Sequence, residues 1–174
     1  MLSTLFKPRP AKATGAALYS AVAAQSRAPV FYQALGVPDR IDARFELYSL
    51  HLAILLERLA GQGEQAEEVA QEAFDAYVRS LDDVLRDVGI GDLSMAKKMK
   101  QVAALVLGRL KGVRDALAPP DVAVLEALLG RTVYAEADSA EPARLAAYVV
   151  AAHEALAAQP LAELLAGKPA WPQP

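Results

Sequence analysis

Apolar residues recur three and four positions apart along most of the chain, which is the spacing of a helix that buries one face. Long helices are predicted over residues 14–27, 40–60, 64–88, 93–117, 120–134 and 139–158, and short ones over residues 29–35 and 160–166. No segment shows the strict alternation of a half-buried strand. The pattern therefore predicts an all-α, single-domain bundle of about six to eight helices with no sheet.

The predicted helix over residues 40–60 carries apolar residues on two opposite sides. One face holds Ile41, Phe45, Tyr48, Leu52, Leu55 and Leu59, and the other holds Leu47, Leu50 and Ile54. Because both faces need to be covered, one interpretation is a central helix sandwiched between neighbours in the core. The alternative leaves the second face open for an apolar segment of a partner.

The next two predicted helices carry opposite charge. Residues 64–88 hold eight acidic residues against two basic ones, a net charge of −6, whereas residues 93–114 hold six basic residues and no acidic one. Lys97, Lys100, Lys111 and Arg114 form a stripe of about 25 Å, interrupted by Leu107. The stripe is either an ordinary solvated face or a surface for an acidic partner, anionic lipid or RNA.

Four residues mark where the predicted helices begin or end. Gly36 stands where a residue of left-handed conformation closes a short helix. Asp39 is the expected N-cap of the helix over residues 40–60, and Asp92 and Ser139 are the expected N-caps of two later ones.

Composition agrees with one helical domain, because Ala and Leu exceed a third of the 174 residues. Residues 1–12 hold two prolines and three basic residues and are predicted to be a flexible arm, residues 13–166 the helical domain, and residues 167–174 a Pro-rich tail. The N-terminus lacks the order of a secretory signal, and no stretch is long enough for a transmembrane helix. We expect a cytoplasmic protein, or one peripheral at the inner face of the cytoplasmic membrane.

Candidate chemistry is sparse. The chain has no cysteine and two histidines, and it lacks phosphate-binding glycine loops, nucleophile elbows and zinc-binding pairs. We therefore predict no catalytic residue, no metal site and no cofactor. His51 is interpreted as a buried structural histidine and the same holds for His153, with a haem or metal ligand as the alternative. Tyr134 and Tyr148 are interpreted as core residues with a hydroxyl at the edge.

The net charge of −3 argues against a general nucleic-acid binder, so no DNA partner is expected. A local basic patch can still serve an RNA or a ribosome.

Three segments carry a resemblance to a known family. Residues 31–52 read FYQALGVPDRIDARFELYSLHL, residues 89–100 read GIGDLSMAKKMK, and residues 130–134 read GRTVY. Their sequence, order and spacing resemble the ubiquinol-cytochrome c chaperone family over roughly residues 14–155. The resemblance implies an assembly factor for ubiquinol-cytochrome c reductase, the respiratory complex III, that holds newly made cytochrome b. It also implies a small helper protein and the ribosome as partners.

The resemblance and the residue patterns together suggest a binding surface. Leu47, Leu50, His51 and Ile54 are predicted to border the client, Met95 to adapt to it, and Lys97, Lys98 and Lys100 to steer docking. Phe31, Tyr32, Val37, Pro38, Asp39, Arg44 and Phe45 match the first family motif and either contact a partner or fix the entry to the helix over residues 40–60. The alternatives are a ribosome, RNA or membrane adaptor, and a carrier of haem or another hydrophobic ligand.

Overall fold

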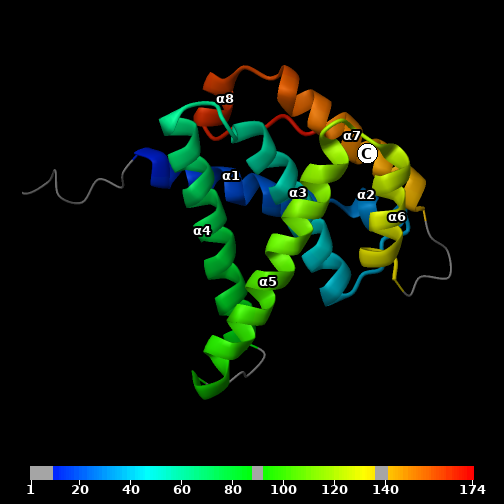
Figure 1. Cartoon of the computed structure of the whole chain (residues 1–174), viewed down its shortest axis with the longest axis horizontal. Helices are drawn as coiled ribbons and strands as arrows, with labels where there is room; N and C mark the ends of the chain where they lie inside the picture. Colours follow the sequence, from blue (N-terminus) through cyan, green and yellow to red (C-terminus); the bar gives the residue numbers. More distant parts are fainter. Residues whose placement is uncertain (1–9, 88–91, 136–140) are drawn as a thin grey trace, which may run out of the picture.

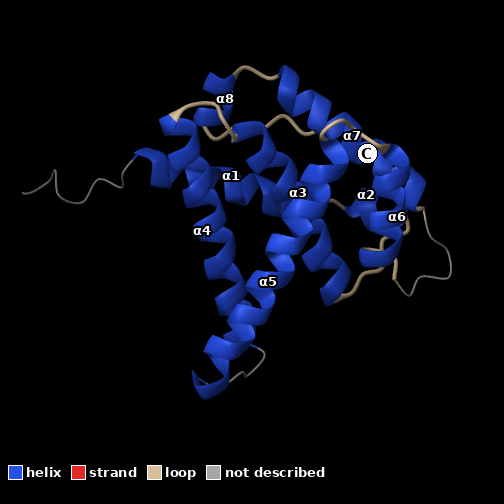
Figure 2. Cartoon of the chain, viewed as in Figure 1, coloured by secondary structure: helices blue, strands red, loops and turns tan. Residues whose placement is uncertain are grey.

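The computed structural model describes residues 10–87, 92–135 and 141–174, and the structure of these residues is entirely helices and connecting loops (Figures 1 and 2). The helices are α1 (Pro10–Ser26), α2 (Pro29–Gln33), α3 (Ile41–Leu59), α4 (Glu64–Asp87), α5 (Asp92–Leu117), α6 (Val122–Thr132), α7 (Pro142–Ala158) and α8 (Leu161–Leu165). Among the described residues there is no strand, so the predicted all-α class is confirmed.

The first helix begins earlier than the pattern predicts. Helix α1 starts at Pro10 instead of near residue 14, because proline is tolerated in a first turn, where its missing N–H would have no helical partner. Residues 10–12, assigned above to a flexible arm, therefore belong to the helix. The rest of that predicted arm, residues 1–9, lies outside the described residues, as does the predicted cap Ser139.

The turn between α2 and α3 contains one confirmed prediction and one error. Gly36 has φ +64°, the left-handed conformation expected of it. Asp39 does not cap α3: the residue at the N-cap position is Arg40, and no side chain caps that helix end. The Asp39 carboxylate instead accepts a hydrogen bond from Nε of Arg44 at 2.6 Å, because a guanidinium one turn into the helix is a stronger partner than a backbone N–H. Asp121 does cap α6, since its Oδ1 accepts from the N–H of Val124 at 3.1 Å.

Helix α3 is the central element of the bundle. It packs against α1, α4, α5 and α7, which lie on both of its apolar faces, while Ile41 in its first turn is 75% exposed (Figure 1). Leu47, Leu50 and Ile54, on the second apolar face, are all at most 3% exposed. The interpretation of a central helix covered on both faces is confirmed, and the alternative of an open second face is wrong.

Helices α4 and α5 run past the body as an antiparallel pair, and their far ends stand clear of the other helices (Figure 1). Near the body, Tyr77 of α4 is buried and its hydroxyl lies 2.9 Å from Oγ of Ser49 on α3. Towards the far end α4 exposes Val84, and α5 exposes Leu105 and Leu107. The pair, called the α4–α5 arm below, therefore combines charged and apolar surface outside the core.

Gly15 allows α1 and α4 to approach each other closely. A Cβ at Gly15 would lie 2.5 Å from Cβ of Glu72 and 2.8 Å from the backbone nitrogen of Ala73. Backbone atoms at that distance cannot move aside without separating the two helices.

We expect Gly15→Ala to lower the free energy of unfolding by about 2 kcal/mol, although alanine is the better helix former. Gly108→Ala in α5, where a Cβ would meet open space, is the matched control. It should raise stability by about 0.5–1 kcal/mol. Urea denaturation of the two variants measures both effects, and a gain in stability for Gly15→Ala would contradict the close helix contact.

Candidate functional site

His51 is at the centre of a buried polar network. Its Nδ1 lies 2.8 Å from the carbonyl oxygen of Leu47, and its Nε2 lies 2.9 Å from the hydroxyl of Tyr148. Since a carbonyl only accepts, Nδ1 carries the proton and Nε2 accepts the proton of the Tyr148 hydroxyl. Gln25 donates to the same hydroxyl at 2.9 Å, and Ser26 Oγ lies 3.2 Å from Nδ1.

Burial favours the neutral imidazole and lowers the pKa of His51 to about 4, although the hydrogen bond to Leu47 opposes the shift. Both ring nitrogens are already hydrogen-bonded inside the protein. The interpretation of His51 as a buried structural histidine is therefore confirmed. In this arrangement neither nitrogen of His51 has a free lone pair for a haem iron or a metal ion, so His51 does not support the carrier alternative. In the described part of the chain, no three His, Asp or Glu residues gather as a metal site would need.

The two tyrosines named from the sequence are core residues, as predicted. Tyr134 is 4% exposed and its hydroxyl donates to the carbonyl of Leu35 at 2.7 Å. Burial, with a smaller contribution from the charge of Glu141, raises the pKa of Tyr134 to about 12. Burial also raises the pKa of Tyr148, so both phenols act as hydrogen-bonding groups of the fold.

The residues of the first motif divide into a buried set and a surface set. Phe31 and Val37 are in the core, where the Phe31 ring contacts His51 and Tyr148 at centroid distances of 5.3 and 5.0 Å. Pro38 and Phe45 are half-buried. These four residues fix the turn and the entry to α3, which was one of the two roles predicted for the motif.

The surface set of the motif borders a shallow hollow of about 350 Å³. Its walls are Arg27, Pro29, Tyr32, Gln33, Asp39 and Arg44. Arg44 pairs with Asp39 and lies 5.9 Å from the centroid of the Tyr32 ring, while Tyr32 donates to the carbonyl of Ser26 at 3.0 Å. The polar groups of Tyr32 and Arg44 thus have partners within the fold, and direct contact of this set with a partner stays a prediction.

The basic stripe predicted along α5 is partly paired with acidic residues. Arg114 of the stripe pairs with Glu57 at 3.1 Å, and Arg109, which lies outside the stripe, pairs with Glu46 at 2.7 Å. Both acids come from α3. Lys111 pairs with Asp115 in the next turn of its own helix. The half of the stripe nearest the body is therefore largely neutralised.

Lys97 and Lys100 of the stripe, with Lys98 between them in the sequence, are the uncompensated lysines of α5. All three are exposed, and within the described ranges none of them makes an ion pair. They belong to the first half of α5, and α5 begins at the far end of the α4–α5 arm (Figure 1). Met95, predicted to adapt to a client, is only 6% exposed, so its side chain packs inside the arm and presents no surface.

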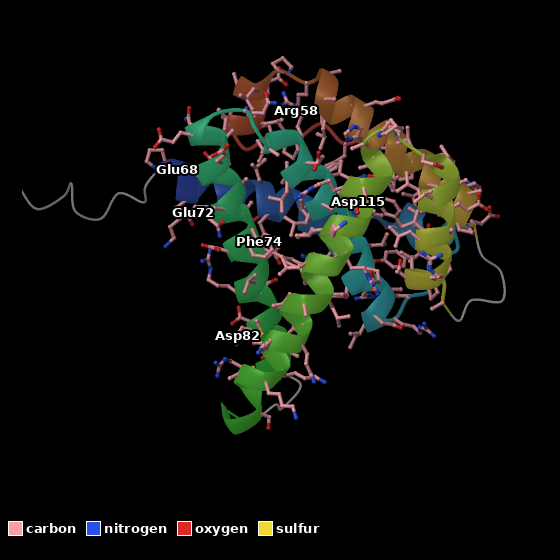
Figure 3. All side chains as sticks on the ribbon, in the orientation of Figure 1. Arg58, Glu68, Glu72, Phe74, Asp82 and Asp115 are labelled. Carbon is pink, nitrogen blue, oxygen red and sulfur yellow. The ribbon has the colours of Figure 1, made fainter. Side chains whose placement is uncertain are left out.

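Acidic side chains line the neighbouring helix. Figure 3 shows Glu68 and Glu72 on the side of α4 that faces away from α5, with Asp82 further along the arm. Because the uncompensated lysines belong to α5, the arm presents negative charge from one helix and positive charge from the other. An acidic or anionic partner would approach it from the α5 side.

The four residues predicted to border the client are buried in the structure. Leu47, Leu50, His51 and Ile54 are 0–3% exposed, so they present no surface to a partner. Among the described residues, the large apolar side chains that are exposed are Ile41 at the start of α3, Val84 of α4, Leu105 and Leu107 of α5, and Val122 and Val124 of α6. The helical spacing of α5 places Leu105 and Leu107 outside its buried face, so their exposure could have been predicted from the sequence.

None of the helices in the described part of the chain combines the length and the apolar character that a membrane span requires.

Comparison with known proteins identifies the family. The family model described as ubiquinol-cytochrome C chaperone matches residues 33–171. No curated protein matches the sequence. A solved structure, described as the crystal structure of the Cbp3 homolog from Brucella abortus, is similar with a TM-score of 0.87 at 30% identity, covering 99% of this chain and 97% of that one. The chain therefore belongs to the ubiquinol-cytochrome C chaperone family.

Proposed function

We propose that this chain is a non-enzymatic assembly chaperone for ubiquinol-cytochrome c reductase, and that it binds newly made cytochrome b. The family match over residues 33–171 supports the class of function. Within the structure one observation carries the proposed mode of binding: three uncompensated lysines stand on an arm that also exposes Leu105 and Leu107. An apolar, membrane-destined client with anionic surroundings needs both kinds of contact.

The position of the arm fits a chaperone that works at a membrane surface. Each lysine near an anionic lipid surface contributes about 1 kcal/mol of attraction, and exposed leucines add apolar contact. The proposed location is therefore the inner face of the cytoplasmic membrane, where cytochrome b is inserted. In this proposal the buried His51 network and the core tyrosines take no part in binding cytochrome b.

Reversing the charge of the lysines should weaken client association without weakening the fold. We expect the double variant Lys97→Glu, Lys100→Glu to capture pulse-labelled cytochrome b at least about tenfold less well at low salt, because attraction becomes repulsion. Its free energy of unfolding should stay within about 0.5 kcal/mol of wild type, since both side chains are exposed.

The matched control for this experiment is the double variant Lys12→Glu, Arg131→Glu. It makes the same change in net charge at exposed positions on α1 and α6. The control should capture cytochrome b as wild type does. Equal loss of capture in both variants, or a loss of stability that accounts for the loss of capture, would contradict the proposed role of the lysines.

A second candidate function rests on the same lysines. Ribosomal RNA is also an anionic partner, and binding through phosphate contacts falls steeply as salt rises. Binding of purified ribosomes that is abolished by Lys97→Glu, Lys100→Glu, together with unchanged capture of cytochrome b, would favour the adaptor function over the chaperone function.

A further inference from the structure

The C-terminal segment, residues 168–174, lies extended along the body. After α8 the chain turns at Gly167, which has φ +78°, and returns towards α7 and α2 (Figure 1). A Cβ at Gly167 would lie 2.8 Å from Cβ of Ala17, so the turn is pressed against α1. We call residues 168–174 the tail segment.

Two glutamine side chains, one of them buried, hold the backbone of the tail segment. Gln159, at the end of α7, is 8% exposed. Its Nε2 donates to the carbonyl of Lys168 at 2.7 Å, and its Oε1 accepts from the N–H of Ala170 at 3.0 Å. One amide thus satisfies a carbonyl and an N–H two residues apart, as a neighbouring strand would. Contacts of this kind recognise an extended backbone and not a particular sequence.

Other groups fix these glutamines in place. The guanidinium of Arg58 (Figure 3) donates to the carbonyls of Leu156 and Gln159 at 2.7 and 3.1 Å, which ties the end of α7 to α3. Gln25 of α1 donates to the carbonyl of Pro172 at 3.4 Å as well as to the hydroxyl of Tyr148. The polar network around His51 therefore extends to the tail segment.

The Trp171 ring packs against other aromatic rings at this surface, in a position that we call the aromatic seat. Its ring meets the His51 ring edge to face at a centroid distance of 5.3 Å, and His51 in turn contacts Phe31 and Tyr148. The indole N–H is buried but finds no acceptor among the described residues. Burying an unbonded donor costs free energy, so an aromatic ring without a donor would occupy this seat without that cost.

We propose that Gln25, Phe31, His51, Tyr148 and Gln159 form a peptide-recognition groove, and that the tail segment occupies it as a ligand that can be exchanged. The occupant it accepts in exchange is an extended segment of a partner protein with an aromatic residue between prolines. Prolines at 169, 172 and 174 favour an extended backbone and have no N–H that would need an acceptor. This inference goes beyond the proposed function and does not depend on cytochrome b.

The tail segment suits exchange because few contacts hold it. Three hydrogen bonds and one ring contact join the tail segment to the groove. The side chains of Lys168, Ala170 and Gln173 are exposed. Segments with few buried apolar contacts open at a small fraction of the global free energy of unfolding. The helices around the groove, in contrast, belong to the main core.

Trp171 is the one tryptophan of the chain, so the fluorescence of the full-length protein reports its seat directly. The competitor is a synthetic peptide with the sequence of residues 168–174 carrying W171F. Adding this peptide should shift the Trp171 emission to longer wavelength in a saturable way. Half-saturation is expected in the millimolar range, because the attached tail segment competes at an effective concentration of about that size.

The full-length variant Ala170→Pro sharpens the experiment. It removes the N–H that donates to Gln159 while leaving the groove unchanged. The concentration of the same peptide at half-saturation should then fall about fivefold, because the attached tail segment has lost one net hydrogen bond. A peptide carrying W171A is the control and should leave the emission unchanged in both proteins.

Three outcomes would overturn the inference. One is an emission that does not respond to the W171F peptide in either protein. Another is an equal response to the W171A peptide, which would show that the aromatic seat is not recognised. The third is a concentration-dependent dimer that the peptide dissolves, which would assign the groove to a second copy of this chain. None of these outcomes bears on the proposed function, because no client is present.

Discussion

Ile54→Ala is expected to lower the free energy of unfolding by about 3–4 kcal/mol, a large part of the stability of a domain of this size. Ile54 is 0% exposed and lies on the second apolar face of α3, where neighbouring helices cover it. Truncation removes buried apolar atoms and leaves a cavity that close-packed neighbours cannot fill. The midpoint and slope of a urea unfolding curve measure the loss.

Ile41→Ala is the matched control, since it makes the same change on the same helix. Ile41 is 75% exposed, so its truncation should cost less than about 0.5 kcal/mol. Together the two variants distinguish a helix that is covered on both faces from a helix that offers one face to a client. If Ile54→Ala left stability within that small range and instead blocked capture of cytochrome b, the covered position of α3 would be wrong.

Acid should weaken the fold through His51. The pKa of His51 is about 4 in the folded chain and about 6.5 in the unfolded chain, so the unfolded state binds more protons between these values. The free energy of unfolding therefore rises with pH through this window, and His51 contributes about 3 kcal/mol above pH 6.5 that is lost as the pH falls to 4. Burial is the main cause, because it penalises the charged imidazolium.

Urea denaturation at a series of pH values between 7 and 4 tests this. We expect His51→Gln to be less stable than wild type at pH 7, since it disturbs the bonds to Leu47 and Tyr148, but to lose much less stability on acidification. A slope that stays unchanged in His51→Gln would contradict a buried neutral histidine.

The helices could be predicted because each depends on residues close in sequence. The two apolar faces of residues 40–60 indicated a helix that needs cover on both sides, and α3 has that cover. The left-handed conformation of Gly36 depends on local backbone geometry alone. Asp39 was assigned wrongly because Arg44 and the backbone compete for one carboxylate, and the spacing does not decide between them.

The surface was harder to predict because charge depends on partners distant in sequence. On α5, Arg114 of the stripe pairs with Glu57, and Arg109 outside the stripe pairs with Glu46; both acids are more than fifty residues away. The groove for the tail segment joins Gln25, His51 and Gln159 from three helices, and no local pattern connects them. The family motif indicated the region near α2 and α3, but not which of its residues are in the core.

The most direct test of the chaperone function is to delete the gene and record reduced-minus-oxidised spectra of the membranes together with ubiquinol-cytochrome c reductase activity. The account predicts loss of the cytochrome b signal and of the activity. A wild-type copy and the Lys12→Glu, Arg131→Glu control should restore both, while Lys97→Glu, Lys100→Glu should restore them poorly. An unchanged cytochrome b signal and reductase activity in the deletion strain would contradict the proposed function.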